Sequence, residues 1–170
     1  MKRVNSLSAG YSLIEIMITM ALFVLIAYLL VANVSFLNRS IVRSEADKLC
    51  MICKYLQRCA MAANKKQILH FDELRQEYSF NGVVYRLPGK VNFGYLKGVK
   101  GPPSSPKKEI SKPITFKSHK IIFYPDGIIS SGAVYLTDCD RQYLYSISSA
   151  VAQVSYIRKY TYNGKWILIS

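Results

Sequence analysis

The stretch Leu13–Leu37, LIEIMITMALFVLIAYLLVANVSFL, decides the fold class of this 170-residue chain. It carries a single charge, on Glu15, and Thr19 is its only polar side chain between Ile16 and Ala32 apart from one tyrosine. At about 1.5 Å per residue, a helix of this length spans the ~30 Å hydrocarbon core of a membrane. We therefore expect a transmembrane helix, because the rest of the chain is too short to bury it in a core.

The first ten residues of the chain, MKRVNSLSAG, contain two basic residues and no acid, and they end in Gly10. A secretory signal places small residues for cleavage after its apolar region, whereas here the glycine comes before it. One interpretation is an uncleaved signal anchor whose Glu15 reaches the lipid head groups. The junction itself, Gly10-Tyr11-Ser12-Leu13-Ile14-Glu15, places a glycine, an aromatic residue and a glutamate at the start of the apolar helix.

This junction resembles the processing site of type IV prepilins and type II secretion pseudopilins, although Tyr11 stands where that family more often has Phe. The resemblance implies a leader, residues 1–10, that prepilin peptidase removes by cutting after Gly10. It also implies an N-methylated mature N-terminus at Tyr11 and helix packing with other pilins or pseudopilins. A charge within a membrane helix usually has a partner. The new amine of a neighbouring subunit, offset by about 6 Å, would serve Glu15.

Helical spacing of apolar residues continues to Asn64, so we expect one helix with a transmembrane half, 11–37, and an amphipathic half, 38–64. Asn-Gly pairs at 81–82 and 163–164 predict two β-hairpins. Further strands are expected at 90–96, 114–124, 133–137 and 142–148, and the proline-rich segment 98–113 as a surface loop. The predicted fold class is α+β and pilin-like: a long N-terminal helix, transmembrane in its first half, packed on a mainly antiparallel β head over 65–170.

A downstream stretch narrows the resemblance. Phe123-Tyr124-Pro125-Asp126-Gly127, followed by Ser131-Gly132 and the strand Ala133–Leu136, is similar to a turn and strand of the H-type minor pseudopilins and of minor pilins for DNA uptake. Proline second and glycine fourth favour a type I turn. The resemblance implies a structural subunit of a type II secretion pseudopilus, held in the bacterial inner membrane by a single pass in contact with its lipid. The N-terminus would be cytoplasmic and the head periplasmic. The alternative function is a type IV pilus minor pilin that binds DNA.

The positive net charge of the chain is compatible with the alternative function, DNA binding by a minor pilin. The chain has 23 Lys and Arg against 10 Asp and Glu, a net charge of +13, which suits anionic partners. Seven of the lysines lie between positions 97 and 120, and the last hairpin adds Arg158, Lys159 and Lys165 among aromatic residues. Basic residues among aromatic ones suit DNA contacts, but a solvated surface explains them more simply. DNA-binding relatives carry arginines after the turn glycine, where this chain has Lys165 and Trp166.

Four cysteines, Cys50, Cys53, Cys59 and Cys139, are open to three uses. Disulfides are favoured because the head would face an oxidising compartment, and three pairings are conceivable. Buried free thiols and a metal site are the alternatives, although zinc normally needs a second close pair or two nearby histidines. The sequence holds no nucleophile motif, zinc-protease motif or phosphate-binding glycine loop. We therefore expect no catalytic residue, cofactor or metal ion.

Overall fold

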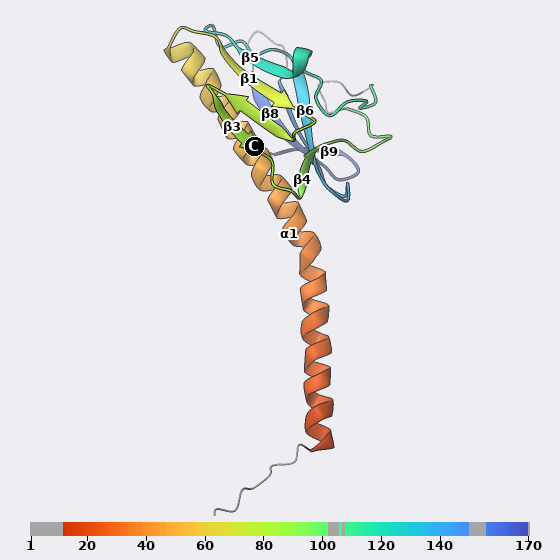
Figure 1. Ribbon diagram of the computed structural model, residues 1–170. Coiled ribbons are helices and arrows are strands. Elements are labelled where there is room, and N and C mark those ends of the chain that lie inside the picture. The colour runs from red at the N-terminus through yellow and green to blue at the C-terminus, as the bar shows by residue number, and fades with distance from the viewer. Residues whose placement is uncertain (1–11, 102–105, 107, 150–155, 170) are drawn as a thin grey trace, which may run out of the picture. The chain divides into compact units, whose positions relative to one another are not determined.

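The computed structural model describes residues 12–101, 106, 108–149 and 156–169, without the side chains of residues 30–36. Gly10 and Tyr11 lie outside the described residues. In the described part, one long helix, α1 (Leu13–Ala62), precedes all the strands (Figure 1). The chain divides into two compact units, Met1–Leu37 and Asn38–Ser170. The second unit contains the last part of α1 and every strand.

The strands form two antiparallel sheets. Sheet A has the order β3-β2-β1-β5, and sheet B has the order β4-β6-β7-β8-β9. A short 3₁₀ helix, η1 (Lys117–His119), precedes β5. Sheet A comprises β1 (Gln67–Asp72), β2 (Glu77–Phe80), β3 (Val83–Arg86) and β5 (Lys120–Phe123); sheet B comprises β4 (Val91–Phe93), β6 (Gly132–Asp138), β7 (Leu144–Ser149), β8 (Ile157–Tyr162) and β9 (Trp166–Ile169). The fold is therefore mixed α+β.

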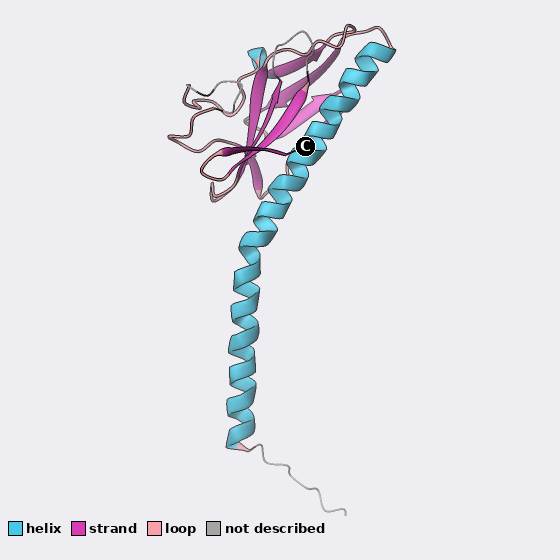
Figure 2. Cartoon of the chain, turned by 180° about the vertical axis from the view of Figure 1, so that it is seen from behind, coloured by secondary structure: helices cyan, strands magenta, loops and turns pink. Residues whose placement is uncertain are grey.

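The main core of the second unit lies between α1 and the two sheets. In Figure 2 the C-terminal part of the helix runs along the strands. Its buried side chains recur three or four residues apart, as an amphipathic helix requires. Sheet A adds Leu69, Phe71 and Phe123 to this core, and sheet B adds Leu136 and Ile147. The helix contributes Val42, Ala46, Leu49, Cys50, Cys53, Leu56 and Ala60.

A second, smaller core covers the other face of sheet B. Side chains alternate between the two faces of a strand, so β6 gives Val134 and Leu136 to the main core but Ala133 and Tyr135 to the smaller one. The segment 98–113, expected to be a surface loop, contributes Val99 and Ile110 to that cluster. The indole N–H of Trp166 donates a 2.8 Å hydrogen bond to the main-chain oxygen of Lys100. Part of the proline-rich segment therefore packs against this second face of sheet B.

The structure contradicts the prediction that the first half of the helix is transmembrane. Among the residues described, no helix is both long enough and apolar enough to cross a membrane. The predicted fold class is wrong in this respect, and so is the placement as a single-pass inner-membrane protein.

The β prediction is confirmed at its strongest turn. Phe80 pairs with Val83, leaving a two-residue loop in which Asn81 and Gly82 have φ of 48° and 79°. These left-handed values fit a type I′ hairpin turn. The last hairpin differs slightly, because Tyr162 pairs with Trp166 across three residues rather than two.

The remaining strands depart from prediction in two places. The strand β1, which the sequence reading missed, pairs with both β2 and β5 at the centre of sheet A. The expected strand 114–124 is broken by η1, where Ser118 has a φ of 55°. Its first part, around Ile114, bridges to β6 in sheet B, while β5 joins sheet A. The residues predicted as one strand therefore pair with both sheets.

Candidate functional site

Glu15 lies in the first turn of α1, where the amides of Glu15 and Ile16 donate to the main-chain oxygen of Ser12 at 2.9 and 3.2 Å. A carboxylate there is stabilised by the helix dipole. The Glu15 side chain is exposed. Among the described residues, no cation forms an ion pair with it.

The first unit surrounds Glu15 with exposed apolar side chains. Leu13, Phe23 and Tyr28 are about three-quarters exposed, and other large apolar residues between them are about half exposed or more. They lie on all sides of the helix, and a helix that is apolar all round is normally buried. Exposed apolar surface of this extent marks an interaction site. The residues concerned are Leu13, Ile14, Ile16, Met17, Ile18, Met20, Leu22, Phe23, Val24, Leu25, Ile26 and Tyr28.

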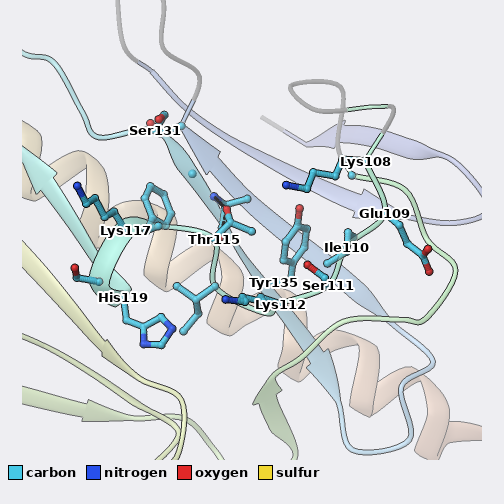
Figure 3. Close-up of a pocket in the computed structure, with 17 residues that line it drawn as sticks. Lys108, Glu109, Ile110, Ser111, Lys112, Thr115, Lys117, His119, Ser131 and Tyr135 are labelled. Atoms are coloured by element: carbon cyan, nitrogen blue, oxygen red, sulfur yellow. Dashed lines mark hydrogen bonds between the residues drawn. The ribbon is translucent and has the colours of Figure 1, made fainter.

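The second unit carries a basic groove of about 930 Å³ beside the start of β6 (Figure 3). In Figure 3, Lys117 and His119 lie at one end and Lys108 and Glu109 at the other, with Thr115 between them. The groove is lined by residues 108–112 and 114–119, by 131–133 and Tyr135, and by Gly101 and Ser149. We call this set the basic groove.

The groove floor is joined to β6 of sheet B by hydrogen bonds. The amide of Thr115 donates to the oxygen of Ala133 at 2.9 Å, and the amide of Tyr135 donates to the oxygen of Pro113 at 2.8 Å. The Thr115 hydroxyl accepts from the Ala133 amide at 2.7 Å. Burial raises the pKa of Tyr135 to about 12, so its hydroxyl is neutral at physiological pH.

The three basic residues singled out in the last hairpin have different surroundings. Arg158 is exposed, with its guanidinium 4.2 Å from the centre of the Tyr156 ring. Lys165 is exposed at the hairpin turn. Lys159 is buried, and its ammonium donates to the Asp47 carboxylate of α1. Burial lowers the pKa of Lys159, and nearby Arg43 lowers it further.

All four cysteines, each within the described part of the chain, are free thiols. Cys50 and Cys53 lie buried in the main core, Cys59 is half-buried and Cys139 is exposed. Burial raises the pKa of Cys50 and of Cys53, which makes them poor nucleophiles. The side chains of Cys50 and Cys53 both belong to the core stripe of α1 and not to a surface. Among the described residues, no group of three His, Cys, Asp or Glu could hold a metal ion.

Sequence reasoning found the lysine run at 97–120 but not the groove. Lys112 and Lys117 flank the short extended segment around Ile114 that bridges to β6, and both line the groove. The sequence pattern joined this segment and β5 into one strand. Knowledge of the break at Ser118 was needed to separate them. Comparison of the chain with protein-family models, with curated proteins and with solved structures gives no match.

Proposed function

We propose that this chain is a structural subunit of a helix-packed filament, and specifically a minor pseudopilin of a type II secretion system. One observation carries the proposal: the apolar surface of α1 between Leu13 and Tyr28 is exposed on all sides of the helix. Such a helix is stable in water only when other helices cover it. A filament whose subunits pack through their N-terminal helices supplies that cover.

Glu15 would determine how far neighbouring helices are shifted along their axes in this packing. Once covered by apolar neighbours, its carboxylate costs free energy unless a cation approaches it. Cleavage after Gly10 would create an amine at Tyr11, four residues earlier on the chain. A neighbour shifted by about 6 Å along the helix would bring its amine to Glu15. The junction's resemblance to prepilins supports this arrangement, and prepilin peptidase and other pseudopilins are the proposed partners.

The test separates processing from assembly. Gly10→Leu co-expressed with a prepilin peptidase should remain full length, whereas the unchanged chain should lose residues 1–10, as intact mass spectrometry measures. Glu15→Ala should be cleaved normally yet enter filaments poorly, while Glu15→Asp should retain part of the assembly. Accumulation of the shorter mass from Gly10→Leu would contradict the processing step. Normal filament entry of Glu15→Ala would contradict the role of Glu15.

A second candidate function, a minor pilin for DNA uptake, is favoured by one feature: the exposed Arg158, with its guanidinium over the Tyr156 ring, belongs to the same hairpin whose turn carries the exposed Lys165. An arginine over an aromatic ring suits contacts to phosphates and bases. A DNA-binding site in this hairpin would not include Lys159, because the Lys159 ammonium is paired with Asp47. Duplex binding that persists near about 150 mM salt and is lost in Arg158→Ala/Lys165→Ala would favour this function over secretion.

A further inference from the structure

The basic groove has unpaired positive charge that the fold itself does not use. Lys108, Lys112 and Lys117 are exposed along its rim, and in the described part of the chain none of them forms an ion pair. The single acid among the lining residues is Glu109, and its Oε1 accepts a 2.9 Å hydrogen bond from the amide of Gly98. Like charges along one groove repel one another. An anionic ligand would relieve that repulsion.

The floor of the groove offers no ring face for base stacking, and the one exposed aromatic ring among the lining residues is the imidazole of His119 at one end. The aromatic residues of the floor, Phe116 and Tyr135, are each 3% exposed, so neither offers a ring face to a ligand. Single-stranded nucleic acids are held largely by such stacking. The groove offers hydroxyl groups instead, from Ser111, Ser118 and Ser131. Hydroxyls and ammonium groups donate hydrogen bonds to carboxylates and to peptide carbonyls.

The lysines are fixed at separate points along the groove. Lys112 leads into the segment that bridges to β6, and Lys117 opens η1. The next two residues of η1, Ser118 and His119, both have left-handed backbone conformations, with φ of 55° and 50°. Each lysine provides one compact charge, not the two-pronged contact of an arginine. Separate point charges along a groove match carboxylates that are spaced along an extended chain.

We propose that the basic groove binds an acidic polypeptide segment of another protein. The carboxylates lie against Lys108, Lys112 and Lys117, and the serine hydroxyls hold the segment's main-chain oxygens. This binding is independent of the filament role of α1, because every groove residue belongs to the second unit.

The test uses the full chain in a nonionic detergent, which covers the exposed apolar residues of α1. The probe is a fluorescein-labelled peptide of alternating glutamate and serine, followed by fluorescence anisotropy. Lys112→Gln/Lys117→Gln should weaken binding at least about tenfold at about 150 mM salt. The matched control, Lys65→Gln/Lys90→Gln, removes the same charge outside the groove and should change binding less than about twofold. Circular dichroism checks that both variants are folded.

A steric variant separates the groove from charge alone. Ser131→Trp keeps every charge and places an indole in the groove, so it should also abolish peptide binding. Three outcomes would overturn the proposal: equal losses in the two double variants, equal binding of the matching glutamine peptide, or no binding by the unchanged chain. Tighter binding of a labelled oligothymidylate than of the peptide would also overturn it and assign the groove to nucleic acid.

Discussion

Single residues with the same charge take different roles here because neighbours on a strand face opposite ways. Arg158 and Lys159 are adjacent in β8, so their side chains point to opposite faces of sheet B. Lys159 faces α1 and pairs with Asp47, whereas Arg158 stacks on Tyr156 on the other face. A sequence reading that treats the two as one basic cluster cannot distinguish them, because it does not know which face the helix covers.

Gly132 is required by its contact with an aromatic ring. A Cβ atom added there would lie 2.5 Å from a ring carbon of Phe116, which is buried in the main core. We expect Gly132→Ala to lower the free energy of unfolding by roughly 1–3 kcal/mol through overpacking. Gly89→Ala is the matched control, since nothing lies within 4 Å of its added Cβ. Denaturant titration followed by circular dichroism measures both, and equal effects would contradict the packing role.

Tyr135 gives a prediction for alkaline pH. Burial raises its pKa from 10.0 to about 12, so above pH 10 the unfolded chain loses this proton before the folded chain does. The stability contribution is therefore full below about pH 10 and is lost as the pH rises towards 12. Tyr135→Phe should make the free energy of unfolding fall less steeply over that range. Denaturant titrations of both chains from about pH 9 to about pH 12 measure this slope, and equal slopes would contradict the prediction.

At the scale of elements, turns with a specific local chemistry are the part that could be predicted. The Asn81-Gly82 hairpin is confirmed, and so is the turn at Pro125, where the amide of Gly127 donates to the oxygen of Tyr124 at 3.0 Å. Its position was not predictable: Gln57 of α1 donates a 2.8 Å hydrogen bond to the oxygen of Gly127. Local sequence specifies a turn, whereas its docking depends on residues 70 positions away.

Two elements were missed because their signals are tertiary. β1 carries only a short alternation, with Leu69 and Phe71 buried, directly after the helix end. The helix stops in a Schellman arrangement, in which Asn64 has a φ of 48° and the amide of Lys65 bonds the oxygen of Ala60 at 3.1 Å. The segment 98–113 is polar and proline-rich, so the burial of Val99 and Ile110 depends on the outer face of sheet B.

The core stripe of α1 predicts how single truncations on one element differ. Leu56 is fully buried between the helix and the sheets, whereas Met51 on the same helix is 69% exposed. Leu56→Ala should cost about 2–5 kcal/mol of unfolding free energy, because it removes apolar contacts and leaves a cavity. Met51→Ala should cost less than about 0.5 kcal/mol. Denaturant titration of the two variants side by side measures the difference, and similar values would contradict the assignment of the buried face.

At the scale of the whole molecule, the two units differ in what covers their apolar residues. The second unit buries a large set of apolar side chains in its own two cores. In the first unit, the large apolar side chains that the structure describes are exposed. A unit with its own core is expected to unfold cooperatively, so the buried thiols of Cys50 and Cys53 should become accessible together.

Thiol labelling tests this cooperativity and decides the state of the cysteines. Cys139, which is exposed, should react with iodoacetamide in the folded chain, and Cys59 more slowly. Cys50 and Cys53 should react only when the second unit opens, because burial both shields these thiols and raises their pKa. Peptide mass spectrometry over a time course should therefore show the labelling of Cys50 and Cys53 rising together through the denaturant transition. Cys139→Ser should remove the fast reaction alone. Labelling of fewer than four thiols in the unfolded, unreduced chain would reveal a disulfide and contradict the free-thiol state.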